Sequence, residues 1–277
     1  MNVRDIISSP VSEVTRLKGH QTIRFVTDGF SLLVSDASYI PVFLREYSYE
    51  RKLDPDQYAS EAERILAEHE LLDFAGESVL ILDNHGFTVI PDSFYSEEYA
   101  RSMLEMECSL NESEIIYERT LQERRIHILF PCPGSLEVLK NRLTGKCSII
   151  HSVECLMSLS DQVRARDHQR GFLLADVQDS TLALLVIRAD EIILLNRYQL
   201  GDPSDFIYHT LNTMKQLDMD RETVPVYISG TVHPDHELSG LIKKYIRHVK
   251  STPYYLENLS REEMLRYMLL SEGSKCA

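Results

Sequence analysis

The sequence lacks several features that would define a class of protein at once. It has no tryptophan, only 11 glycines in 277 residues, and no apolar run near the roughly 18–20 residues that a membrane span needs. Its first ten residues include Arg4 and Asp5 and contain no apolar core, which argues against a signal peptide. The five cysteines form no C-x-x-C pair. We therefore expect reduced thiols, no membrane span and a cytoplasmic location.

Positive charge is also scarce. The chain has 29 Lys and Arg against 43 Asp and Glu, a net charge of −14. Such a chain repels nucleic-acid backbones unless its cations gather on one face. The most basic stretch, residues 243–250, is typical of the solvated side of a helix. We expect no nucleic-acid partner.

Familiar catalytic signatures are missing as well. There is no P-loop, no dinucleotide-binding glycine triplet and no G-x-S-x-G motif. His233 and His236 have a spacing that could serve zinc, but no third ligand is evident nearby, and we expect no metal site. Cys132 precedes a predicted helix whose dipole could lower a thiol pKa, but no histidine accompanies it in sequence. We expect no catalytic residue and no cofactor.

The most informative feature that is present is an order of elements that occurs twice. In the first copy, strands near residues 22–27, 30–34 and 41–47 are separated by an Asp28-Gly29 turn and a turn near Asp36, which predicts an antiparallel meander. An amphipathic helix over 56–72 and a buried strand at 78–82 follow. We expect His69, on the apolar stripe of that helix, to be a partly buried core-edge histidine.

The second copy begins at Gly171. It predicts strands at 172–175, 181–187 and 191–195, a helix opened by Asp202-Pro203, and a buried strand at 224–228. Helices and strands also fill residues 93–170 between the copies. Ser260 and Glu263 form a capping box for a last helix, after which we expect Gly273–Ala277 to be loose.

This repeat predicts an α/β protein of two lobes, each a mixed sheet flanked by helices, facing each other across a cleft. We place the first lobe at residues 1–168, with an inserted segment at about 93–151. The second lobe is residues 169–277, and the charged stretch 164–170 is the expected linker.

The plan resembles the duplicated ribonuclease-H-like lobes of the actin-like ATPase superfamily. The amino-acid sequences of three stretches are closer still to those of an uncharacterised bacterial family of unknown function thought to share that fold. Those stretches are Ile23–Ser31, Gly86–Asp92 and Tyr227–Gly230. The likeness runs nearly the full length of the chain, and none of the stretches is a specific catalytic signature.

The resemblance implies where a nucleotide would bind. In the superfamily an Asp-x-Gly turn in each lobe cradles phosphate and organises a metal, and paired glycines admit the adenosine. Here Thr27 replaces the first aspartate, and Gln178 replaces the second glycine. If the cleft binds nucleotide, the implied binding residues are those that keep part of the pattern: Asp28, Gly29, Asp176, Ser180, Thr181 and Gly230.

The paired-glycine element is also partial, since it reduces to Ser229-Gly230. Because all three motifs are partial, the first hypothesis is a non-catalytic scaffold that binds a protein partner, either another protein or a second copy of the chain. The segment 93–151 is the expected contact, and its candidate residues are Tyr95, Tyr99, Ile115, Tyr117 and Phe130. The alternative is a nucleotide-dependent phosphotransferase or ATPase with drifted motifs. A ribonuclease-H-type nuclease would need Asp28, Asp176 and Asp179 to converge on metals, but the repeat places them in different lobes.

Overall fold

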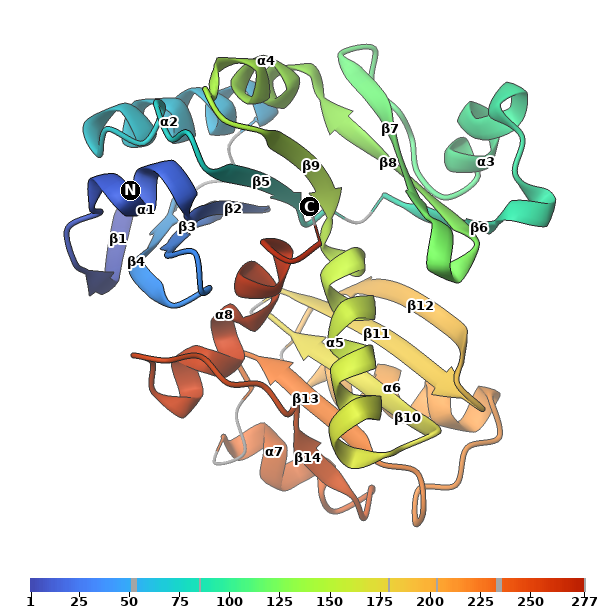
Figure 1. Ribbon diagram of the computed structural model, residues 1–277. Coiled ribbons are helices and arrows are strands. Elements are labelled where there is room, and N and C mark those ends of the chain that lie inside the picture. The colour runs from blue at the N-terminus through green and yellow to red at the C-terminus, as the bar shows by residue number, and fades with distance from the viewer. Residues whose placement is uncertain (51–53, 85, 179, 203, 233–235, 277) are drawn as a thin grey trace. The chain divides into compact units, whose positions relative to one another are not determined.

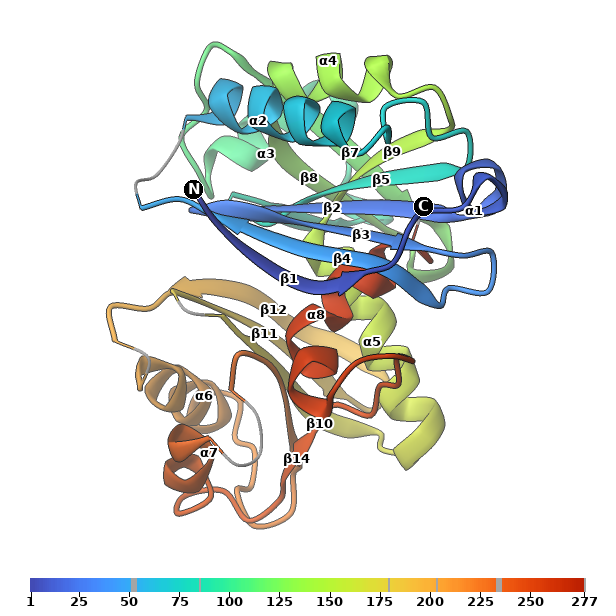
Figure 2. The same ribbon diagram turned by 90° about the vertical axis from the view of Figure 1, so that its left-hand side faces the viewer.

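The structure is a computed structural model that describes residues 1–50, 54–84, 86–178, 180–202, 204–232 and 236–276 (Figures 1 and 2). The chain divides into two compact units. Unit 1 is Met1–Ser152 with Gly273–Ala277, and unit 2 is Val153–Glu272. The predicted lobes, 1–168 and 169–277, remain a prediction.

Unit 1 is built on a six-stranded mixed sheet in the order β1-β4-β3-β2-β5-β9. Strands β2, β3 and β4 form the predicted antiparallel meander, while β5 and β9 run parallel to β2. Helices α2 and α4 pack against each other over this sheet (Figure 2). The bounds of the elements are β1 Asn2–Ser8, α1 Glu13–Lys18, β2 His20–Val26, β3 Gly29–Ser35, β4 Pro41–Ser48, α2 Pro55–Glu68, β5 Glu77–Leu82, α4 Gly134–Arg142 and β9 Cys147–His151.

A second sheet of three strands, in the order β6-β8-β7, has α3 beside it. It contains β7 and β8 of the predicted inserted segment 93–151 and also β6, which precedes that range, whereas β9, within the range, is a strand of the larger sheet. The small core of the three-stranded sheet consists of Ile90, Leu104 and Leu129. The element bounds are β6 Thr88–Pro91, the 3₁₀ turns Asp92–Phe94 and Glu97–Tyr99, α3 Ala100–Glu105, β7 Glu114–Leu121, the 3₁₀ turn Gln122–Arg124 and β8 Ile126–Pro133.

Unit 2 repeats the plan of the larger sheet. Its five strands follow the order β12-β11-β10-β13-β14, with the meander antiparallel and β13 parallel to β10. One apolar core joins the sheet to α6 through Phe206 and Met214. The element bounds are α5 Ser152–Asp167, β10 Gly171–Val177, β11 Thr181–Arg188, β12 Glu191–Gln199, α6 Asp205–Gln216, β13 Val226–Gly230, α7 Glu237–Ile242, β14 Val249–Ser251 and α8 Arg261–Gly273.

Several elements of the structure differ from what the sequence predicts. Strand β1 and helix α1 were not predicted, because β1 is largely exposed and lacks an alternating apolar pattern. Helix α6 begins at Asp205, later than the predicted start at Asp202, whose carboxylate instead accepts the Ser204 N–H at 2.8 Å. Pro203 lies outside the described residues.

The expectation of a loose tail is wrong for residues 273–276, and Ala277 lies outside the described residues. Ser274 is only 4% exposed, and the Cys276 carbonyl accepts a hydrogen bond from Arg119 Nη2 of β7 at 2.9 Å. The tail is therefore held by packing and hydrogen bonding in unit 1. The predicted capping box is confirmed, since Glu263 N–H bonds Ser260 Oγ at 3.3 Å and Ser260 N–H bonds Glu263 Oε2 at 3.0 Å.

Candidate functional site

The carboxyl end of β10 holds the predicted aspartate of the second lobe. Asp176 is 3% exposed, and its two carboxylate oxygens accept hydrogen bonds from neighbouring side chains. Ser229 Oγ lies 2.8 Å from Oδ1, and Gln178 Nε2 lies 2.9 Å from Oδ2. Each oxygen thus has a partner within the protein. A metal at Asp176 would share the carboxylate with these two hydrogen-bond donors.

Gly230 ends the adjacent parallel strand, and it is required there. Its φ of +90° is a conformation that side-chain-bearing residues rarely adopt, and an added Cβ would lie 2.0 Å from the Val177 carbonyl oxygen. The Gln178 amide nitrogen would be only 3.0 Å from that Cβ. The glycine therefore serves the close approach of β10 and β13, with Gln178 packed over it.

Ser180 and Thr181 support the β10–β11 hairpin. The Ser180 carbonyl accepts the Leu200 N–H and the Gln199 side-chain amide, each at 2.8 Å. Thr181 Oγ1 accepts from Arg197 Nη2 at 3.2 Å. These contacts tie the turn to the end of β12. Of the predicted residues, the structure brings Asp176, Thr181 and Gly230 to one end of this sheet.

Asp28 and Gly29 form the corresponding turn of unit 1. The Asp28 carbonyl accepts the Tyr49 N–H at 2.8 Å, and the Thr27 carbonyl accepts the Tyr58 hydroxyl of α2. A Cβ on Gly29 would lie 2.0 Å from the Tyr47 carbonyl oxygen. This glycine is therefore explained by its contact with β4. The turn is bound to its own unit by backbone groups.

Sequence reasoning missed a buried charge cluster at the same end of the unit 1 sheet. Arg24 of β2 donates from Nε to Asp83 Oδ2 at 3.0 Å, and Ser152 Oγ donates to Asp83 Oδ1. The side chains of Arg24 and Asp83 are only 5% and 1% exposed. A guanidinium thus lies near the end of the strand that leads into the phosphate-type turn. The available signal was a lone arginine within the apolar run Ile23–Val26.

The structure also describes His236 and Cys132, the candidates for a zinc ligand and a reactive thiol. His236 Nδ1 accepts the Leu238 N–H at 3.2 Å and caps α7, while His233 lies outside the described residues. Within the described ranges there is no group of three His, Cys, Asp or Glu that could hold a metal. Burial raises the pKa of the Cys132 thiol to about 12. That thiol is protonated at neutral pH and is a poor nucleophile.

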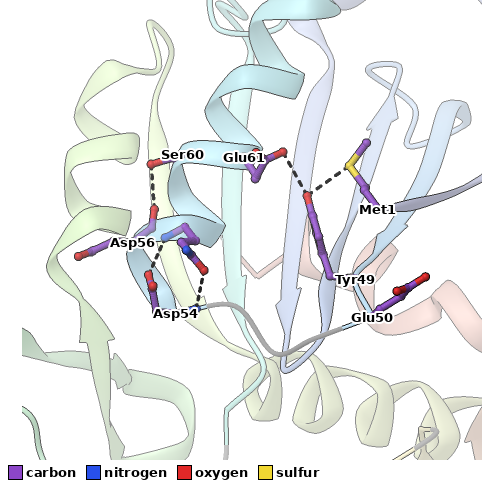
Figure 3. Close-up of a pocket in the computed structure, with 8 residues that line it drawn as sticks. Met1, Tyr49, Glu50, Asp54, Asp56, Ser60 and Glu61 are labelled. Carbon is purple, nitrogen blue, oxygen red and sulfur yellow. Dashed lines mark hydrogen bonds between the residues drawn. The ribbon is translucent and has the colours of Figure 1, made fainter.

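A concavity of unit 1 lies at the amino end of α2 (Figure 3). Its volume is about 960 Å³, and four carboxylates, Glu50, Asp54, Asp56 and Glu61, line it. Asp54 is occupied as the helix cap, accepting the Gln57 N–H at 2.9 Å. Burial and Glu61 raise the pKa of Tyr49 to about 12. This acidic lining is unsuited to a phosphate.

Solved structures with the same architecture define the class of the protein. A Bacteroides thetaiotaomicron protein with an actin-like ATPase fold and unknown function matches with a TM-score of 0.74 at 20% identity, covering 87% of this chain and 93% of that one. A PilM–PilN type IV pilus biogenesis complex matches at 0.61 and 11% identity, covering 94% and 98%. The ethanolamine utilization protein EutJ from Carboxydothermus hydrogenoformans matches at 0.54 and 11%, covering 98% and 93%. The predicted fold class is confirmed: the chain has the actin-like ATPase fold.

Its family can be stated as well. The chain belongs to a family of proteins of unknown function, DUF3822, whose sequence profile matches residues 15–249. This confirms the predicted resemblance to an uncharacterised family with this fold. A comparison with curated proteins gives no match. Among the described residues, no helix is both long enough and apolar enough to cross a membrane.

Proposed function

We propose that this protein is a non-catalytic actin-like scaffold that binds a protein partner in the cytoplasm. The observation that carries the proposal is the chemistry at the carboxyl ends of the two large sheets. In unit 1 that end holds the buried Arg24–Asp83 pair. In unit 2 the Asp176 carboxylate is hydrogen-bonded by Ser229 and Gln178.

Neither arrangement suits a nucleotide with its metal. Mg²⁺ binds oxygen ligands in an octahedral arrangement and usually keeps several bound waters, so it needs accessible oxygens and space around them. The Gln178 amide already bonds the one retained aspartate, and Arg24 adds a positive charge that repels a cation. If nucleotide is bound nevertheless, Asp28, Gly29, Asp176, Ser180, Thr181 and Gly230 remain the residues to examine.

The partner surface we propose lies on the inserted segment. Of its predicted contact residues, Phe130 is fully buried. Tyr95 and Tyr117 are partly exposed and make contacts within their own unit, since Tyr95 stacks on His127 at 3.8 Å and the Tyr117 hydroxyl bonds Glu137. Tyr99 and Ile115 are 54% and 43% exposed. Two further apolar side chains of the segment, Phe94 and Met106, are 72% and 85% exposed. An apolar patch marks a protein contact where its side chains lie together, and we propose that these four form such a patch.

Thermal unfolding with and without Mg-ATP tests the catalytic side of the proposal. A specific ligand at a hundred times its Kd adds about 2.7 kcal/mol of stability. We expect no shift in Tm and no ATP hydrolysis above background with magnesium or manganese. Turnover that is lost in Asp176→Asn would contradict the proposal and favour the phosphotransferase alternative.

Co-purification from the source cell tests the partner surface. The variant Tyr99→Ser with Met106→Ser should lose a partner that the wild type retains. A matched control is Tyr208→Ser with Tyr245→Ser, which removes exposed tyrosines of unit 2 at 65% and 52% exposure. Equal recovery of the partner by all three proteins would remove the inserted segment from the proposal.

A further inference from the structure

The two large sheets end differently on the meander side. In unit 1 the outer meander strand β4 is covered by β1, which pairs with it antiparallel from Asn2↔Ser48 to Ser8↔Phe43. The corresponding strand of unit 2 is β12, which is the last strand of its sheet (Figure 1). No strand within the described residues pairs with the outer side of β12. Unit 1 therefore shows that an additional antiparallel strand can pair with the outer strand of this meander.

The backbone of β12 offers hydrogen-bonding groups on that outer side. Leu200 N–H bonds the Ser180 carbonyl, and Thr181↔Gln199 is the next pair of the β11–β12 ladder. Because bonded and non-bonded pairs alternate in an antiparallel ladder, Gln199, Arg197 and Leu195 direct their N–H and C=O groups away from β11. The Asn196 side chain supports this geometry, since its Oδ1 accepts the Arg197 N–H at 2.7 Å.

The outer edge of β12 also lacks the usual protection against pairing. Proteins guard free edges with prolines, charges or irregularities. The edge strand β1 has Arg4 and Asp5 and a register shift between Asp5 and Ile7. From Leu194 to Gln199, β12 has no proline and one charge, and the shift in its pairing with β11 lies before this stretch. That charge, Arg197, is only 8% exposed.

A second copy of the chain fits this edge. Copies with a net charge of −14 repel each other, so they can meet only where like charges are not opposed. An antiparallel pair of β12 strands centred on Asn196 would place Leu195 opposite Arg197 of the second copy. Leu194 would lie opposite Tyr198 of the second copy, and no two side chains of like charge would lie opposite each other. Apolar cross-strand pairs of this type stabilise sheets.

We propose that β12 pairs with β12 of a second copy, antiparallel and centred on Asn196, and so joins two unit 2 sheets edge to edge. The Asn196 amide oxygen lies where a carbonyl of the added strand would lie, and it releases the Arg197 N–H when that strand binds. The paired stretch is short compared with interfaces that bury roughly 800 Å² per partner. The dimer is therefore reversible and depends on concentration. This inference is independent of the partner surface proposed on the inserted segment.

Sedimentation velocity over a concentration series is the first test. The wild type should shift from monomer to dimer, and Leu195→Pro should weaken association at least tenfold, because proline removes an outward N–H while the ladder to β11 remains. Val14→Ser, on α1 of unit 1 and 67% exposed, is the control and should dimerise as the wild type does. A wild type that stays monomeric throughout, or a dimer lost in Val14→Ser and kept in Leu195→Pro, would overturn the proposal.

Cross-linking gives a test that does not depend on a proline variant. In the proposed register the two Asn196 side chains form a non-bonded antiparallel pair, whose Cβ atoms lie about 4.5–5.5 Å apart. Under mild oxidation Asn196→Cys should give a disulfide-linked dimer several-fold faster than the wild type, whose five cysteines set the background. Glu191→Cys, on the same strand, should stay at background. Equal linking of the two variants would show that the proposed pairing is wrong.

Discussion

Units 1 and 2 share an order of strands but differ in the polar side chains buried at the ends of those strands. In both, an antiparallel meander is followed by a parallel strand. The carboxyl end of the first sheet buries an ion pair, Arg24 with Asp83, whereas that of the second buries a carboxylate held by neutral donors. The backbone plan therefore does not need a particular polar group at this place. It needs only that each buried polar group has a partner.

The largest expected effect comes from breaking the unit 1 pair. Arg24→Met keeps the length of the side chain but leaves the Asp83 carboxylate buried without its cation. Loss of one partner of a buried ion pair costs about 3–5 kcal/mol. Urea unfolding should show this loss. The corresponding change in unit 2, Asp176→Asn, keeps an oxygen acceptor and should cost about 1 kcal/mol.

The double variant Arg24→Met with Asp83→Leu is the control for this comparison. Removing both charges should recover much of the stability lost in Arg24→Met, because no uncompensated carboxylate remains. If Arg24→Met costs no more than Asp176→Asn, the two sheet ends are energetically alike and the contrast between the units is wrong.

Gly230 allows a sharper test of the unit 2 sheet end. Gly230→Ala places a side chain at φ +90° and within 2.0 Å of a backbone oxygen, so we expect a loss of about 1–3 kcal/mol. Gly240 of α7 is the matched control, since nothing lies within 4 Å of an added Cβ. Gly240→Ala should stabilise by about 0.5–1 kcal/mol. Equal Tm values for the two variants would contradict the account of the β10–β13 contact.

The smallest effect concerns pH and is confined to unit 1. Burial, with the nearby Arg45 guanidinium, lowers the pKa of His69, whose Nε2 lies 2.9 Å from Arg45 Nη1. The unfolded chain, with a His pKa of about 6.5, therefore binds the proton first. The contribution of His69 to the free energy of unfolding is therefore full above the unfolded pKa. It decreases as pH falls from the unfolded pKa to the lower pKa of the folded state.

Chemical unfolding between pH 7.5 and 5 measures this slope. His69→Gln should make the decline in stability shallower than in the wild type. A slope that is identical in His69→Gln and the wild type would assign the pH dependence to other groups.

The repeated plan could be predicted because its signals are local. Asp-Gly turns between apolar runs and the 3.6-residue period of α2 depend on neighbours in sequence. The buried strand predicted at 78–82 is confirmed as β5, Glu77–Leu82. Strand β1 escaped prediction because an exposed edge strand needs no apolar alternation, and its pairing partner lies about forty residues away in β4.

The candidate site could be predicted only in part, since its decisive contacts are non-local. Glutamine at position 178 was recognisable as a departure from the superfamily pattern, but its bond to Asp176 was not. Arg24 and Asp83 are 59 positions apart, and only the parallel pairing of β2 with β5 brings them together. A sequence shows that a buried charge needs a partner, while the sheet register decides which one it finds.

The tail that returns to unit 1 has a consequence for synthesis. Unit 1 begins at Met1 but is completed only by the residues after Glu272, so unit 2 interrupts it in sequence. On the ribosome, residues 153–272 are synthesised as one continuous stretch before the last segment of unit 1 exists. Unit 1 therefore cannot be completed until all of unit 2 has been made, and a chain that stopped before Gly273 would leave β7 without the carbonyl that Arg119 binds.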